Sequence, residues 1–126
     1  MNPLSELTAK VLEFRDERNW AQFHSLRNLI VSLNLEAGEL LELTQWKSDT
    51  EMAGLLDQAD AREALRDECA DILIYLLLIA EQAGIDLAEA TRLKLAKNAV
   101  RYPVEISYGS SRKSSQAPAA ERRDKV

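Results

Sequence analysis

Cysteine, glycine and proline are all scarce in this chain. Its 126 residues include one cysteine, four glycines and three prolines. A single cysteine excludes an intrachain disulfide and is typical of a reducing compartment, so we expect a cytoplasmic protein in which Cys69 is a small buried side chain. Few glycines and prolines, together with 46% hydrophobic residues, indicate one mostly helical globular domain.

Basic charge and long apolar runs are lacking as well. The chain has 16 lysines and arginines against 21 aspartates and glutamates, a net charge of −5. This balance disfavours a nucleic-acid polymer as partner, because binding along a phosphate backbone needs a basic surface, but it allows an anionic small molecule held through a metal ion. The longest apolar run, residues 72–80, is far shorter than the roughly 20 residues that cross a bilayer. We therefore expect no membrane span and no signal peptide.

Apolar residues recur at helical spacing in four segments, which predict an all-α fold. The expected helices cover residues 4–18, 25–45, 61–83 and 86–101. The polar residues between the second and third helices, 46–60, predict a loop with a short turn. The domain is expected to end at residue 108, because the tail 109–126 is too polar to bury a core and is predicted to be disordered.

Several residues suit the ends of these helices. Asn2 or Ser5 can cap the first helix, and Gly84 can end the third. Asp86, with an acidic residue three positions later, resembles a capping box for the fourth. The run 72–80 in the third helix is apolar on every side, and such a helix is normally buried. One four-helix subunit leaves part of it uncovered, so we expect a homo-oligomer.

Two acidic pairs stand out within these helices. Glu36 and Glu39 lie three residues apart in the second helix, which places their carboxylates on one face. Glu68 and Asp71 repeat that spacing at the start of the apolar run in the third helix. An isolated pair is usually a solvated face, but these pairs are doubled and embedded among leucines. Because an unpaired carboxylate among apolar residues is costly, the four residues predict a site for a hard cation.

The ligand types narrow the choice of cation. Four carboxylates offer only oxygen, which favours Mg²⁺ or Mn²⁺ and disfavours zinc. A di-iron carboxylate bundle would need Glu-x-x-His on two helices. The only histidine is His24, and the residue three positions before it is Ala21, so this alternative fails.

Other residues suit a nucleotide. Tryptophan and tyrosine rings can stack on a base, and a Lys-Asn-Arg stripe on one face of the fourth helix can hold a triphosphate. Each has an ordinary explanation as core or as solvated surface, and it is their presence together with the acidic quartet that favours a nucleotide site. The residues concerned are Trp20, Trp46, Tyr75, Lys94, Asn98 and Arg101.

These motifs together resemble a known family. The pattern Glu36-x-x-Glu39 followed by Glu68-x-x-Asp71 is similar to the ExxE…ExxD signature of the all-α nucleotide pyrophosphohydrolases, the MazG-like superfamily. The segments QWKSD at 45–49 and RYP at 101–103 make the chain resemble its dCTP pyrophosphatase branch most closely. The resemblance extends over residues 7–110.

The resemblance implies a fold and a reaction. The fold would be a four-helix MazG-like bundle completed by homo-oligomerisation, as a dimer or tetramer with sites built from more than one subunit. The reaction would be Mg²⁺-dependent hydrolysis of a nucleoside triphosphate to the monophosphate and pyrophosphate. The preferred substrate would be dCTP with its 5-modified relatives, and the role would be to keep these nucleotides out of DNA.

The resemblance also implies roles for individual residues. The acidic quartet would hold Mg²⁺. The choice of Glu39 as the residue that takes the proton comes from the chemistry of such a metal site and not from the resemblance. The base and sugar pocket would comprise Trp20, Ala21, Gln22, Phe23, His24, Trp46 and Tyr75. The phosphates would face Lys94, Asn98 and Arg101.

Two alternatives stay open at this point. The first helix has Val11 in a stretch where dCTP-preferring members of the branch carry a substrate-binding histidine, so a broader dNTP or NTP preference, or a dUTP preference, is the main rival. The second alternative is a helical interaction module without catalytic activity. Such a module has no reason to keep the acidic quartet complete, and pyrophosphate release separates the two classes.

Overall fold

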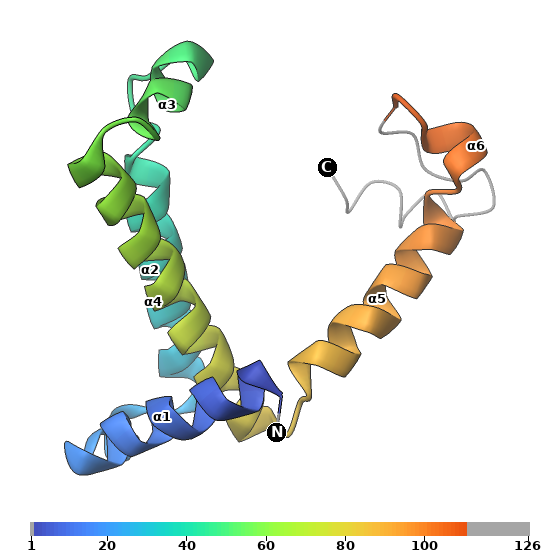
Figure 1. Ribbon diagram of the computed structural model, residues 1–126. Coiled ribbons are helices and arrows are strands. Elements are labelled where there is room, and N and C mark those ends of the chain that lie inside the picture. The colour runs from blue at the N-terminus through green and yellow to red at the C-terminus, as the bar shows by residue number, and fades with distance from the viewer. Residues whose placement is uncertain (1, 111–126) are drawn as a thin grey trace. The chain divides into compact units, whose positions relative to one another are not determined.

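The computed structural model describes residues 2–110, and every regular element in that range is helical (Figure 1). The predicted all-α class is confirmed. The elements are α1 (Pro3–Glu17), the 3₁₀ helix η1 (Trp20–Phe23), α2 (Leu26–Glu42), α3 (Asp49–Leu55), α4 (Ala59–Ala83), α5 (Leu87–Arg101) and α6 (Val104–Ser107). Most of the tail predicted to be disordered, residues 111–126, lies outside the described range.

The helix ends follow the capping residues seen in the sequence. Asn2 caps α1, because its side chain accepts a hydrogen bond from the Ser5 backbone N–H at 2.8 Å. Gly84 ends α4 in the left-handed conformation at φ 68°, which glycine adopts without steric cost. Asp86 caps α5 by accepting from the backbone N–H of Glu89 at 3.1 Å. The predictions for these ends are confirmed.

The prediction of a loop over residues 46–60 was wrong for residues 49–55 and for residues 59 and 60, which begin α4. Residues Asp49–Leu55 form the helix α3, which begins with a reciprocal capping box. Ser48 Oγ accepts from the Glu51 N–H at 3.2 Å, and a Glu51 side-chain oxygen accepts from the Ser48 N–H at 3.4 Å. These bonds satisfy two backbone donors that a seven-residue helix would otherwise leave to water. The polar composition of residues 46–60 indicated a loop, and the capping box at Ser48 was not recognised. The short helix α6, which follows Pro103, was also not predicted.

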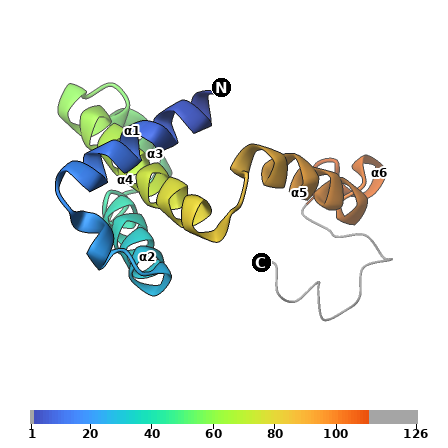
Figure 2. The ribbon, with the colours of Figure 1, turned by 90° about the horizontal axis from the view of Figure 1, so that it is seen from below.

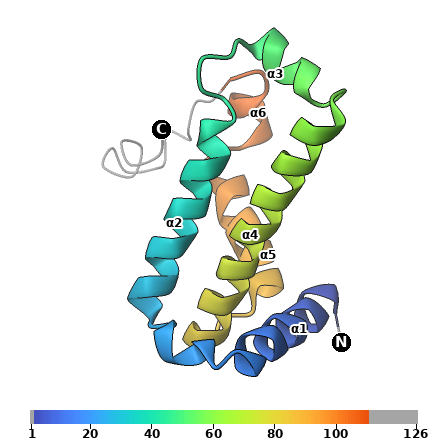
Figure 3. The ribbon, with the colours of Figure 1, turned by 90° about the vertical axis from the view of Figure 1, so that its left-hand side faces the viewer.

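The first of two structural units, Met1–Ile85, is built on an antiparallel pair of helices. Helices α2 and α4 lie side by side along their lengths, while α3 and its flanking turns connect them at one end (Figure 3). Helix α1 packs across the other end of α4 (Figure 2). The buried core is small and gathers where these helices meet, comprising Leu29, Leu77, Leu78 and Ala80.

Much apolar surface of this unit is left uncovered. In the run 72–80, Ile74 and Leu76 are 38% and 36% exposed. The homo-oligomer expected from this run stays a prediction. Cys69 is exposed, so the prediction that it is buried was wrong. Within the first unit, the main packing partners of α4 are α2 along its length and α1 at one end, and they cover one strip of its surface.

The second unit begins at Asp86 and contains α5 and α6. Neither helix has a buried residue. No helix in the described range is both long enough and apolar enough to span a bilayer.

Candidate metal centre

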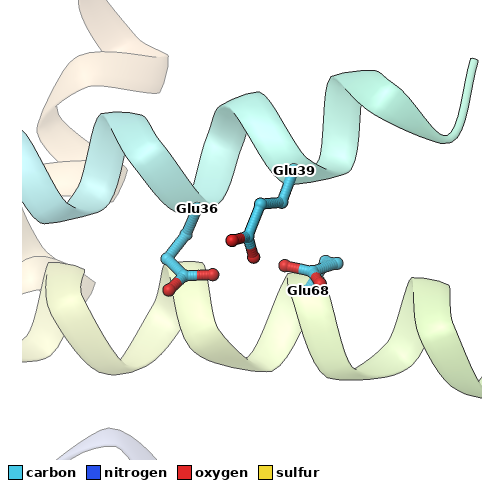
Figure 4. Close-up of side chains that lie close together, drawn as sticks. All are labelled: Glu36, Glu39 and Glu68. Atoms are coloured by element: carbon cyan, nitrogen blue, oxygen red, sulfur yellow. The ribbon is translucent and has the colours of Figure 1, made fainter. Parts of the chain in front are cut away.

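Three carboxylates from two helices point toward one another between α2 and α4 (Figure 4). Glu36 and Glu39 are one helical turn apart on α2, and Glu68 faces them from α4. One oxygen from each residue lies within 4.8 Å of the oxygens of the other two. Glu36 and Glu68 are half-buried, whereas Glu39 is exposed.

The helical repeat explains why these acids face inward. Leu33 and Leu40 lie three residues before and four residues after Glu36, and both are half-buried on α2. Residues at these spacings share a helix face. Because the leucines on this face pack α2 against α4, Glu36 is directed toward α4 as well. The position of the carboxylate thus follows from the apolar stripe around it.

The electrostatics of the cluster disfavour three negative charges. The pKa of Glu36 rises from 4.5 to about 7, first because the carboxyl is partly desolvated, then through a hydrogen bond to Glu39 and the negative charges of Glu39, Asp71 and Glu68. The pKa of Glu68 is raised as well, again mainly by desolvation and then by Glu39. In the absence of a cation the protein therefore retains protons on this cluster at pH values where a free carboxylate is ionised.

Two oxygens of the cluster are buried without a partner. Within residues 2–110, one carboxylate oxygen each of Glu36 and Glu68 has no hydrogen-bond donor. In the described part of the first unit, the ion pairs Arg15–Asp16 and Arg18–Glu17 both lie at the end of α1. A buried polar atom without a partner is costly, and a cation between the three acids would satisfy both oxygens. The donor set contains only oxygen, so the cluster fits a hard divalent cation.

Asp71, the fourth predicted ligand, stands beside this trio. It is half-buried on α4, three residues after Glu68, but it does not belong to the group of mutually close oxygens. Its negative charge still acts on both Glu36 and Glu68. The structure thus brings three of the four predicted ligands together and places the fourth within electrostatic reach.

The two tryptophans lie at opposite ends of α2. Trp20 precedes this helix and Trp46 follows it, and a helix of 17 residues is about 25 Å long. Trp46 is 92% exposed, while Trp20 is 43% exposed and packs on Phe14. Tyr75 is half-buried on α4. Within one chain, therefore, the two indole rings do not line a common pocket.

The remaining predicted base-pocket residues follow Trp20 directly. Ala21, Gln22 and Phe23 are exposed in η1, and the Gln22 amide donates to the Asn19 carbonyl at 3.0 Å. His24 is half-buried, with a pKa lowered by desolvation and then by the positive charge of Arg15. Its Nδ1 is buried with no hydrogen-bond partner within the described residues.

In the second unit, the predicted phosphate-binding residues lie on α5. Lys94 and Asn98 line one shallow hollow together with Ala90, Thr91 and Leu95, as their spacing of four residues predicts. Arg101 is half-buried at the last position of the same helix.

One concave feature was not anticipated from the sequence. An apolar hollow lies where α3 meets the ends of α2 and α4, and three residues of α3 form part of its lining. The available signal was the Ser48-x-x-Glu51 capping box. The lining residues are Leu43, Met52, Ala53, Leu55, Leu56, Ala61, Arg62 and Leu65.

Comparison with known proteins identifies the family. The sequence profile of the MazG-like family matches residues 31–116, which include the acidic cluster, most of α2 and all of α4. The chain belongs to the MazG-like family. The resemblance inferred from the ExxE…ExxD pattern is thereby confirmed, and the all-α architecture is that of a MazG-like protein.

Individual MazG-like relatives agree with this assignment. The chain is 46% identical to mouse dCTP pyrophosphatase 1 over 106 residues, and 43% identical to the human protein of that name over the same length. The matched region is 84% of this chain but 62% of each relative, so the chain spans less than two thirds of the curated relatives. A crystal structure of a pyrophosphatase from Archaeoglobus fulgidus matches with a TM-score of 0.75 and 38% identity, covering 82% of this chain and 94% of that one.

Proposed function

We propose that this protein is a Mg²⁺-dependent nucleoside triphosphate pyrophosphohydrolase that converts dCTP and 5-modified dCTP to dCMP, or its modified form, and pyrophosphate. The observation that carries the proposal is the cluster of three carboxylates with buried, unpartnered oxygens in a MazG-like chain. The similarity to proteins named dCTP pyrophosphatase 1 supports the choice of base. The cellular role would be to remove these nucleotides before they enter DNA.

Glu36, Glu39 and Glu68 would hold the metal ion, with Asp71 beside them. Their all-oxygen donor set suits Mg²⁺, with Mn²⁺ as a second choice, and offers nothing to a zinc ion that prefers Cys or His. A bound Mg²⁺ would neutralise negative charge on the phosphate oxygens of the substrate. Without that neutralisation, a polyanionic triphosphate would be repelled by three carboxylates.

The reaction adds a water molecule across the anhydride between the α- and β-phosphates. The water oxygen forms a bond to phosphorus, the bridging P–O bond breaks, and one proton must leave the attacking water. We assign Glu39 as the acceptor of that proton. It is the exposed member of the cluster and is therefore accessible to solvent, whereas Glu36 and Glu68 are half-buried.

The organic part of the substrate would be bound by the aromatic residues. Trp20 to His24, Trp46 and Tyr75 would contact the base and sugar, while Lys94, Asn98 and Arg101 would face the phosphates. Because Trp20 and Trp46 stand at opposite ends of α2, a pocket that uses both requires residues of two subunits. Exposed apolar residues on α2 and α4, among them Leu35 at 65% and Ile74 at 38%, support assembly as a dimer or tetramer.

We further propose that residues 1–108 form the catalytic domain and that the protein acts in the cytoplasm. The carboxylates and the proposed phosphate ligands all fall within these residues. Cys69 is exposed and free in the described structure, which suits a compartment where thiols stay reduced.

Pyrophosphate release tests the proposal. The wild-type protein is incubated with each deoxynucleoside triphosphate, 5-methyl-dCTP and the ribonucleotides, with Mg²⁺ and with EDTA. The expected result is release only with Mg²⁺ and at least tenfold faster for the two cytosine deoxynucleotides. Equal rates for all bases would indicate a general role in hydrolysing triphosphates. Faster release from dUTP would show that dUTP, and not dCTP, is the preferred substrate. No release with any of them would favour a helical interaction module.

A further inference from the structure

The side chain of Arg18 closes the C-terminal end of α1. Arg18 is the C-terminal cap of the helix, and its guanidinium NH1 donates to the Phe14 carbonyl at 3.0 Å. That carbonyl is one of the last acceptors of α1, which would otherwise depend on water. Asn19 then adopts the left-handed conformation at φ 54°, which asparagine tolerates better than most residues. The chain reverses at this point and brings Trp20 back toward α1.

The same guanidinium lies against two aromatic rings. Arg18 Cζ is 3.7 Å from the centre of the Phe14 ring and 6.0 Å from that of Trp20. The rings of Phe14 and Trp20 meet edge to face, with centres 5.7 Å apart and an interplanar angle of 73°. Both distances from Arg18 fall within the range of cation–π attraction, and the ring pair has the favoured T-shaped geometry. Arg18 is thus bonded to the backbone of one aromatic residue and lies beside both rings.

The segment after Trp20 is held at its far end as well. The Gln22 amide donates to the Asn19 carbonyl, and the Asn28 amide of α2 donates to the Phe23 carbonyl at 3.1 Å. Trp20 therefore stands on a short 3₁₀ turn that is tied to both flanking helices. It still exposes 43% of its surface, enough for a flat ring to lie against it.

We propose that Arg18 is a positioning residue for substrate selection: it fixes the indole of Trp20, through Phe14, in the orientation that stacks on the base. This inference rests on the proposed function for the identity of the ligand. Arg18 need not touch the nucleotide. Its guanidinium is already directed at the Phe14 carbonyl and ring, so its charge acts on the orientation of Trp20. A preoriented ring binds a base without the entropy loss of ordering a free side chain.

The first experiment follows Trp20 without any turnover. The chain has two tryptophans, so Trp46→Phe leaves Trp20 as the only indole. In this background Arg18→Lys keeps the positive charge but removes the planar guanidinium, which donates to the Phe14 carbonyl and stacks on the Phe14 ring. The expected result is a changed emission maximum and near-ultraviolet circular dichroism of Trp20, with unchanged far-ultraviolet dichroism. Arg92→Lys, an exposed arginine on α5, is the matched control and should leave both spectra unaltered.

The second experiment is a double-mutant cycle on the KM for dCTP, with Trp46 present. Arg18→Lys is expected to raise KM about threefold to tenfold and to change kcat less than twofold, the size expected for one lost stacking contact. In a Trp20→Leu background the same substitution should change KM less than 1.5-fold, because a residue that acts through Trp20 has nothing left to orient. Arg92→Lys should leave KM and kcat unchanged.

Each outcome decides the inference. A KM effect of equal size in both backgrounds would show that Arg18 contacts the substrate directly or supports the fold, and would overturn the proposal, as would an unchanged Trp20 spectrum. If Arg18→Lys fails to fold, Phe14→Leu replaces it with the same expectations. If the wild type releases no pyrophosphate, dCTP titrated against Trp20 emission separates the two proposals. If dCTP quenches Trp20 emission in the wild type and does so less in Arg18→Lys, the inference stands while the enzymatic function fails. If dCTP causes no quenching, both proposals are overturned.

Discussion

Replacing Glu36 with glutamine should stabilise the metal-free protein. The substitution keeps the shape of the side chain and removes its charge. In the structure, the charged form of Glu36 faces two other carboxylates, and one of its oxygens is buried with no donor within the described residues. A neutral amide ends that repulsion and offers hydrogen-bond donors to Glu39 and Glu68. If removing the charge of Glu36 stabilises the fold, the residue does not serve stability. Its carboxylate would then be present for binding an ion.

The magnitude follows from the pKa of Glu36. A rise from 4.5 to about 7 corresponds to at most about 3 kcal/mol between the two protonation states. Because this carboxyl is only half-buried, solvent screens the repulsion, and about 1–2 kcal/mol is a realistic gain. The folded state binds the proton more tightly than the unfolded chain does. The stability tied to this proton is therefore fully present below about pH 4.5 and is lost as the pH rises through about 7.

Urea unfolding in EDTA at pH 4 and pH 8, at one protein concentration, checks this expectation. Glu36→Gln should gain about 1–2 kcal/mol over wild type at pH 8 and almost nothing at pH 4. Glu42→Gln is the matched control, because Glu42 is an exposed acid on the same helix. If Glu36→Gln lost stability at pH 8, or gained no more than the control, the crowded-carboxylate account of the site would be refuted.

Three further predictions follow from the same structure. Mg²⁺ at a hundred times its dissociation constant should stabilise the wild type by about 2.7 kcal/mol in thermal denaturation, and Glu39→Gln by much less at that concentration; an equal shift in both would move the ion elsewhere. Ser48→Ala should cost α3 about 1 kcal/mol, visible as faster hydrogen exchange over residues 49–55 rather than as a lower global midpoint. Gly38→Ala should add up to about 1 kcal/mol, because a Cβ there meets no atom within 4 Å, and a loss would reveal another chain packed at this position.

The sequence predicted most of the fold because its signals are local. Capping by Asn2 and Asp86, the stop at Gly84 and the apolar periodicity each act within one helical turn. Helix α3 was missed because its seven residues contain too few apolar positions to show a helical repeat. The capping box that begins at Ser48 was the one sequence signal for this helix. The exposure of Cys69 was also missed. Burial depends on what packs against a helix, and that is not encoded within the helix itself.

The candidate site was also predictable in part from the sequence. The three-residue spacing and the leucines around Glu36 were enough to place the α2 carboxylates on the side that faces α4. The unequal positions of Glu68 and Asp71 were not predictable, because they depend on how α4 is rotated against α2. The separation of Trp20 from Trp46 already follows from the helix predicted between them, and α2 confirms that helix. The proposed base pocket, if it uses both rings, would therefore need a second subunit.

The most direct test of the central claim compares three proteins in one assay. Pyrophosphate release from dCTP is measured with saturating Mg²⁺ for wild type, Glu39→Gln and Glu42→Gln, each shown to be folded by circular dichroism. If the three-carboxylate cluster is the metal centre of a pyrophosphohydrolase, Glu39→Gln should lose at least a hundredfold in kcat while Glu42→Gln keeps the wild-type rate. Full turnover by Glu39→Gln would contradict the account.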